Sequence, residues 1–112
     1  MKVSIDFDGT LSTKKGQKIA QYHLQEGDDL YVTTARPEDG GFTWKEFVHD
    51  TNDDIFEITD ELGIQRNKIR FTNFELKYPY LVDFDVHYDD DSIELDAINE
   101  YTKCKGINIK DM

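Results

Sequence analysis

Two acidic side chains stand two residues apart near the start of the chain, in the segment Asp6-Phe7-Asp8-Gly9-Thr10. If the backbone there is extended, Asp6 and Asp8 point the same way. One carboxylate of such a pair can attack a phosphorus atom and form an acyl phosphate, while the other protonates the leaving oxygen and then activates a water. Acids and glycines are also common where a strand meets a turn, so this segment alone leaves both interpretations open.

Later in the chain, four more residues have side chains that could act on the same phosphoryl group. Thr34 ends an apolar run, and its hydroxyl can donate to a phosphoryl oxygen, although the adjacent Thr33 could take the same role. Lys77 can neutralise the charge of a transferring phosphoryl group. Arg36 could bind a substrate phosphate or base, or it could form a salt bridge with an acidic helix.

Three consecutive acids, Asp89, Asp90 and Asp91, follow an apolar run near residue 88. Such carboxylates repel one another unless a cation offsets them, and Mg²⁺ prefers oxygen ligands. The run also precedes a predicted helix, where Asp91 or Ser92 can cap the first turn and negative charge is favourable. We expect Asp91 to lie nearer the helix cap, and Asp89 and Asp90 nearer a metal.

Residue patterns predict that strands and helices alternate along the chain. Alternating or β-branched runs predict strands at residues 2–6, 30–34, 68–73 and 85–88, with an edge strand at 106–109. Apolar residues at helical spacing predict helices at 16–25, 43–49 and 52–62, and a last helix capped by Asp91 or Ser92. This last helix is expected to turn Ile93, Ala97, Ile98 and Tyr101 toward the core.

The alternation favours a three-layer, Rossmann-like α/β fold with a mainly parallel sheet and right-handed crossovers. Ligands of such folds bind beyond the carboxyl ends of the strands. We therefore expect Asp6, Asp8, Thr34, Lys77 and the acids at 89–91 to meet at one edge of the sheet.

Length and composition predict one domain over residues 1–112, since 38% hydrophobic residues suffice for a single core. The first residues lack the unbroken apolar run of a signal peptide or membrane span, and Cys104 is the single cysteine. These features predict a cytoplasmic protein that does not associate with membranes. The net charge of −11 repels nucleic-acid phosphates and anionic lipids at long range. The oligomeric state is left open.

The order of these residues resembles the haloacid dehalogenase (HAD) superfamily. The resemblance is carried by IDFDGTL at residues 5–11, YVTTAR at 31–36, Lys77, and VHYDDD at 86–91. It spans most of the chain, and an Asp at the second position of the first motif is typical of the phosphatases and phosphotransferases of the superfamily.

The resemblance implies a Mg²⁺-dependent phosphomonoesterase with defined roles. Asp6 would be the nucleophile and a metal ligand, and Asp8 the general acid and base, with its backbone carbonyl on the metal. Thr34, or Thr33 in the other register, would bind the phosphoryl group, and Lys77 would stabilise its charge. Asp89 and Asp90 would hold Mg²⁺. Candidate substrate contacts are Thr33, Arg36, Gly9 and Thr10.

The chain is too short for a substantial cap domain over the site, because residues 11–29 and 37–68 hold little beyond the helices of the core. An open site favours a nucleotide or a nucleic-acid phosphate end as the substrate, and a sugar phosphate is the alternative. A non-catalytic regulatory module that binds Mg²⁺ or a phosphorylated partner is a further alternative. A two-component receiver domain is disfavoured, since its acid pair precedes its phosphorylated aspartate.

Overall fold

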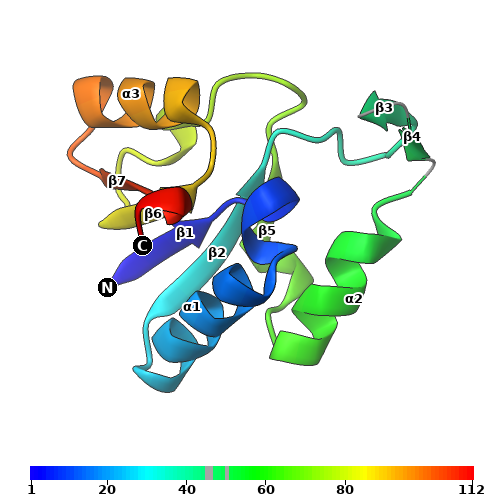
Figure 1. The fold of residues 1–112 in the computed structure, drawn as a ribbon, viewed down its shortest axis with the longest axis horizontal. Coiled ribbons are helices and arrows are strands. Elements are labelled where there is room, and N and C mark those ends of the chain that lie inside the picture. Colours follow the sequence, from blue (N-terminus) through cyan, green and yellow to red (C-terminus); the bar gives the residue numbers. More distant parts are fainter. Residues whose placement is uncertain (45–46, 50) are drawn as a thin grey trace.

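A five-stranded sheet in which all neighbouring strands are parallel forms the middle of the structure (Figure 1). The computed structural model describes residues 1–44, 47–49 and 51–112, and the side chains outside residues 44–50. The strand order is β5-β2-β1-β6-β7. The bounds of these strands are β1 Lys2–Ile5, β2 Asp29–Thr34, β5 Ile69–Phe71, β6 Val86–Asp89 and β7 Lys105–Asn108.

The sheet grows from β1 in two directions. The chain first moves outward from β1 to β2 and β5, and then returns to the other side of β1 to form β6 and β7. The direction of winding therefore changes between the neighbouring strands β1 and β6. In open α/β sheets, the crevice beyond the carboxyl ends of two such strands is where ligands bind.

Helices cover both faces of the sheet (Figure 1). On one face, Ala20 of α1 (Lys14–Gln25) and Ile55 of α2 (Asp53–Leu62) belong to the same buried cluster as Ile5 of β1. On the other face, Ile98 of α3 (Ser92–Tyr101) packs with Leu81, Phe84 and Cys104. The molecule is thus a three-layer α/β fold of the Rossmann-like kind, with an apolar cluster on each side of the sheet.

Local signals in the sequence set the ends of the helices. The side chain of Thr13 accepts a hydrogen bond from the Gly16 amide at the start of α1, and Asp91 accepts one from the Ile93 amide at the start of α3. Helix α2 ends at Gly63, whose φ of +80° lies in the left-handed region that glycine adopts without strain.

The elements of the sheet and its helices begin and end within two residues of their predicted positions, so the periodicity of the sequence predicted most of the architecture. Within residues 1–44, 47–49 and 51–112, no helix is long and apolar enough to span a membrane.

The helix predicted at residues 43–49 is wrong. The chain instead forms an antiparallel hairpin of β3 (Phe42–Trp44) and β4 (Phe47–His49), while residues 45, 46 and 50 lie outside the described residues. The physical reason is composition, because aromatic and β-branched residues fill this segment and favour strands over helices. The hairpin stands between β2 and α2, apart from the sheet (Figure 1).

The predicted inward face of α3 is also partly wrong. Ile98 is buried as expected, but Ile93 and Tyr101 are 71% and 62% exposed. The helix instead buries Glu94 and Leu95 with Ile98. Two apolar stripes compete on this short helix, and the stripe that contacts the sheet layer is the one that includes Leu95.

Candidate active site

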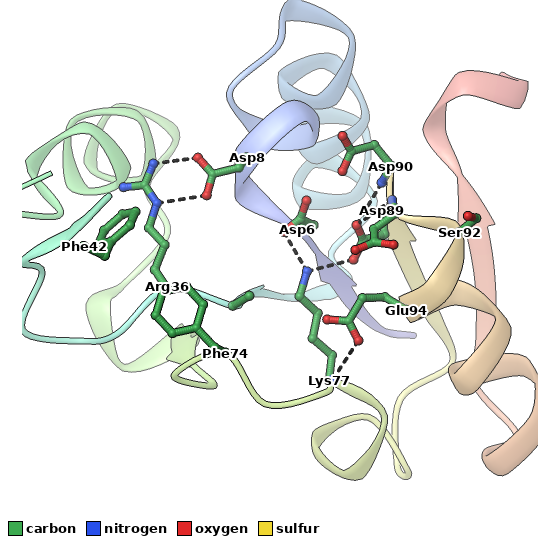
Figure 2. A pocket seen from close by; sticks show the side chains of 12 residues that line it. Asp6, Asp8, Arg36, Phe42, Phe74, Lys77, Asp89, Asp90, Ser92 and Glu94 are labelled. Carbon is green, nitrogen blue, oxygen red and sulfur yellow. Dashed lines mark hydrogen bonds and ion pairs between the residues drawn. The ribbon is translucent and has the colours of Figure 1, made fainter. Parts of the chain in front are cut away.

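The carboxyl ends of β1 and β6 bring two aspartates to a single lysine. The Nζ of Lys77 donates to Oδ1 of Asp6 at 2.7 Å and to Oδ2 of Asp89 at 2.8 Å (Figure 2). All three side chains are buried. The contact lies at the point where the winding of the sheet changes direction, as expected for a ligand site in this class of fold.

Asp6 is fixed by the strand before it and the turn after it. Its amide donates to the carbonyl of Tyr88 in β6, and its carbonyl accepts from the amide of Leu11, which closes a non-helical loop over Phe7–Leu11. The hydroxyl of Thr10 donates to Oδ2 of Asp6 at 3.2 Å. Both carboxylate oxygens of Asp6 therefore have partners within the site.

A side chain of α3 fixes the backbone of Lys77. The backbone amide of Lys77 donates to Oε1 of Glu94 at 3.0 Å, just before the short turn Tyr78–Tyr80. Burial would lower the pKa of Lys77, but Asp6 and Asp89 outweigh it and the pKa is raised. The ammonium group thus stays charged over the whole physiological range.

Four hydrogen bonds hold the carboxylate of Asp89. Its Oδ1 accepts from the amides of Asp90 at 2.9 Å and Asp91 at 3.1 Å. Its Oδ2 faces both Lys77 and Nε2 of His87, the latter at 2.8 Å. Burial opposes ionisation of Asp89, but His87 and Lys77 hold its pKa below the ordinary value, so the group is an anion.

A chain of hydrogen bonds leads from Asp89 across the sheet and determines the protonation of His87. Ionised Asp89 can only accept, so His87 carries its proton on Nε2 and, as a neutral ring, accepts at Nδ1. Ser4 therefore donates to Nδ1 of His87 at 2.9 Å and accepts from Thr33 at 2.8 Å. The Oγ1 of Thr33 in turn accepts from Nη2 of Arg70 at 3.1 Å. Burial lowers the pKa of His87 and keeps the ring neutral.

Three carboxylates in the site are arranged as a cation would require. One oxygen each from Asp6, Asp89 and Asp90 lie within 4.8 Å of one another. Burial raises the pKa of Asp6 well above its ordinary value and the charges of Asp89 and Asp90 add to this, although Lys77 opposes them. One lysine cannot balance three carboxylates, and an all-oxygen donor set suits a hard divalent cation. The cluster does not include Asp91, which caps α3.

The absence of a side chain at Gly9 leaves space for the carboxylate of Asp90. A Cβ atom at Gly9 would lie only 2.2 Å from Oδ2 of Asp90, and the φ of Gly9 is +76°. Any larger residue would therefore push Asp90 out of the carboxylate cluster as well as strain the turn.

Arg36 lies on the opposite side of the pocket and binds Asp8 (Figure 2). Its Nε and Nη2 donate to the two oxygens of Asp8 at 2.9 and 2.6 Å, and its Nη1 and Nη2 donate to Asp54 at 2.7 and 2.8 Å. The fifth N–H reaches Asn52 at 3.4 Å. Burial would lower the pKa of Arg36, but the hydrogen bonds to Asp54 and Asp8 outweigh it and the pKa is raised.

The pocket has a volume of about 480 Å³ and includes six of the predicted site residues. These are Asp6, Asp8, Arg36, Lys77, Asp89 and Asp90. Its lining also includes Ala35, Phe42, Phe74, Asp91, Ser92 and Glu94.

The other four predicted site residues are not part of this lining. Gly9 and Thr10 shape the loop that carries Asp6. Thr34 is fully buried, and its Oγ1 accepts from the amide of Arg36 at 3.3 Å, so it supports the turn that lines the pocket. Thr33 belongs to the hydrogen-bond chain between Ser4 and Arg70.

No protein-family model and no curated protein matches this chain. The chemistry that the pocket residues can perform therefore follows from their own geometry.

Three residues that complete the site were missed by sequence reasoning. His87 was not predicted as a site residue, although it stands two residues before Asp89 in β6, a spacing that places both side chains on one face of the sheet. Glu94 stands three residues after the cap Asp91, which is the spacing of a capping box, yet it binds the amide of Lys77 instead. Asp54 belongs to the acidic helix α2, so its contact with Arg36 confirms the salt bridge that the sequence left open, although Asp54 itself was not singled out.

Proposed function

We propose that this chain is a Mg²⁺-dependent phosphomonoester hydrolase of the haloacid dehalogenase type, which forms an aspartyl phosphate on Asp6. The observation that carries the proposal is the contact of one buried lysine with both Asp6 and Asp89, beside Asp90. One phosphate could therefore reach a nucleophilic carboxylate, an ammonium group that neutralises phosphoryl charge, and a set of metal ligands.

The chemistry has two steps. In the first, an oxygen of Asp6 attacks phosphorus, the bond from phosphorus to the ester oxygen breaks, and Asp8 gives its proton to the leaving oxygen. In the second, Asp8 takes a proton from a water, which attacks the aspartyl phosphate, so that phosphate is released and Asp6 is regenerated. Together the two steps return Asp6 and Asp8 to their starting states.

Lys77 offsets the main electrostatic cost of this reaction, which is the repulsion between the phosphate and the nucleophilic aspartate. Two unit negative charges about 4 Å apart repel by roughly 4 kcal/mol at an effective dielectric near 20, and a phosphate dianion must approach an aspartate. Lys77 contacts Asp6 directly, so its charge lies where the phosphoryl group would arrive. When bound by Asp6, Asp89 and Asp90, Mg²⁺ would supply further positive charge at the same place.

Asp8 has to change partners and take up a proton from solvent before it can act as an acid. Both of its oxygens accept hydrogen bonds from Arg36, which also binds Asp54. A rotation of the Asp8 side chain would free one oxygen for the leaving group, while Arg36 keeps Asp54 as its counterion. Before this rotation all five N–H groups of Arg36 are paired, so we assign Arg36 the role of positioning Asp8 rather than of binding phosphate.

The same pairing favours a second candidate function, a module that binds Mg²⁺ or a phosphate group without turning it over. If Asp8 stays bound to Arg36 in the presence of substrate, the leaving group receives no proton. Metal binding without hydrolysis would be the signature of this alternative.

The test is hydrolysis of p-nitrophenyl phosphate by the wild type and by Asp6→Asn, each with Mg²⁺ and with EDTA. We expect activity that requires Mg²⁺, is lost in Asp6→Asn, and is kept in the control Asp96→Asn, which changes an exposed carboxylate of α3. Activity that survives Asp6→Asn would refute the nucleophile. Mg²⁺ binding by calorimetry with no hydrolysis by the wild type would favour the non-catalytic module.

A further inference from the structure

A large aromatic side chain is exposed at the mouth of the pocket. Phe74 lines the same pocket as Asp6 and Lys77, yet 67% of its surface is exposed to solvent. Figure 2 shows its ring between the side of the pocket that carries Arg36 and the side that carries Lys77. A phenylalanine placed in this way gains little from burial in the protein itself.

The backbone keeps Phe74 in this position at a cost. Asn73 and Phe74 have φ values of +53° and +65°, a region that bulky residues seldom adopt. The amide of Phe74 donates to the carbonyl of Ala35 at 2.6 Å, and that of Asn73 donates to the carbonyl of Arg36 at 3.3 Å. These two hydrogen bonds tie the turn to the wall of the pocket. The strained backbone of the turn therefore keeps the Phe74 ring exposed at the rim of the pocket. Such strain clusters at functional sites.

The wall beside Phe74 offers aromatic surface rather than hydrogen-bond donors. The rings of Phe74 and Phe42 lie 6.4 Å apart in an edge-to-face arrangement. The guanidinium of Arg36 lies 5.0 Å from the Phe42 ring, and its five N–H groups already donate to Asp8, Asp54 and Asn52. A substrate body that extends from the phosphate site along this wall would therefore be recognised through a flat, aromatic group.

Resting on the proposed phosphatase function, we propose that Phe74 stacks on the base of a nucleoside monophosphate whose phosphate lies at Asp6 and Lys77. A pocket of about 480 Å³ is of the size that small ligands occupy. The net charge of −11 opposes the approach of a long polyanion, so a free mononucleotide fits better than the end of a nucleic acid. The stacking residue thus selects mononucleotides over sugar phosphates.

The test compares kcat/KM for adenosine 5′-monophosphate and for ribose 5-phosphate, which lacks the base. In Phe74→Ala we expect kcat/KM for the nucleotide to fall about tenfold, within the range measured for stacking of one base on an aromatic side chain. The value for ribose 5-phosphate should stay unchanged, and Phe74→Tyr, which keeps the ring, should match the wild type. Tyr22→Ala is the control, because Tyr22 is an exposed aromatic residue outside the pocket lining. An equal loss with both substrates would overturn the proposal.

A binding measurement separates this proposal from the phosphatase function. Calorimetry of adenosine 5′-monophosphate with Asp6→Asn and with Asp6→Asn/Phe74→Ala, both in Mg²⁺, reports stacking without turnover. A tenfold weaker binding by the double variant supports stacking even if the wild type hydrolyses nothing, in which case only the phosphatase function fails. If the two variants bind equally and the wild type hydrolyses the nucleotide, stacking is refuted and the phosphatase function stands.

Discussion

Asp6 is a buried carboxylate whose burial and acidic neighbours oppose its ionisation, so the metal-free protein should show this in its pH dependence. The folded-state pKa of Asp6 is raised above its ordinary value of 3.8. The stability that Asp6 contributes is therefore fully present below pH 3.8 and is lost as the pH rises through the folded-state pKa. We expect Asp6→Asn to raise the Tm of the metal-free protein at pH 7 by about 4 °C or more, the shift that ~1 kcal/mol gives in a domain of this size.

Thermal unfolding in EDTA from pH 4 to pH 8 measures this effect. The difference in Tm between Asp6→Asn and the wild type should grow as the pH rises and should shrink when Mg²⁺ is added, since a bound cation stabilises ionised Asp6. A difference in Tm that is constant with pH would contradict the prediction. Asp96→Asn is the matched control, because it changes an exposed carboxylate.

Arg36 and Arg66 both pair with aspartates, but only Arg36 is buried. Lysine cannot reproduce the forked contacts of Arg36 to Asp8 and Asp54. We expect Arg36→Lys to lower the free energy of unfolding by about 1–3 kcal/mol, the cost of leaving buried polar groups unsatisfied. Arg66→Lys, at a pair exposed on both sides, should change it by less than about 0.5 kcal/mol. Urea unfolding of both variants measures the contrast, and similar losses would mean that the Arg36 contacts contribute no more than a surface pair.

At the scale of elements, the sequence predicts what depends on local periodicity and misses what depends on competition between distant parts. The alternation of apolar runs located β1, β2 and β6, and hence the sheet edge where Asp6 and Asp89 meet. The spacing of apolar residues near 43–49 fits a helix and a hairpin alike, and the hairpin forms because aromatic and β-branched residues favour paired strands. The sequence left open a salt bridge between Arg36 and an acidic helix, but which carboxylate of α2 reaches Arg36 depends on how the chain after the hairpin is placed.

The strands β1, β2 and β6 are also linked by the hydrogen-bond chain that passes through Ser4, Thr33 and His87, and this chain should behave as one unit. Ser4→Ala and Thr33→Val should each cost about 1–3 kcal/mol of unfolding free energy, since each leaves a buried polar atom unpaired. Made together they should cost less than the sum, because they remove the same hydrogen bond.

A second cycle gives the control for this coupling. Thr59 is as buried as Thr33, but its hydroxyl donates within α2 to the carbonyl of Ile55. Thr59→Val combined with Ser4→Ala should therefore be additive within about 0.5 kcal/mol. Urea unfolding of the single and double variants gives both cycles. Additivity in the Ser4 and Thr33 pair as well would show that the chain does not act as a unit.

At the scale of the whole molecule, a net charge of −11 sets a repulsive field that a phosphate dianion must cross before it reaches the buried Lys77. Salt screens this field, because the Debye length falls from about 30 Å at 0.01 M to about 10 Å at 0.1 M. The local attraction of Lys77 acts at contact distance and is screened far less. We therefore expect kcat/KM for a dianionic phosphomonoester to rise several-fold when KCl increases from about 10 to about 100 mM, with Mg²⁺ kept saturating at each concentration. Sucrose in place of KCl, as an uncharged solute, should give no such rise. A fall in kcat/KM with salt would mean that positive charge near the pocket, rather than the overall charge, governs the approach of the substrate.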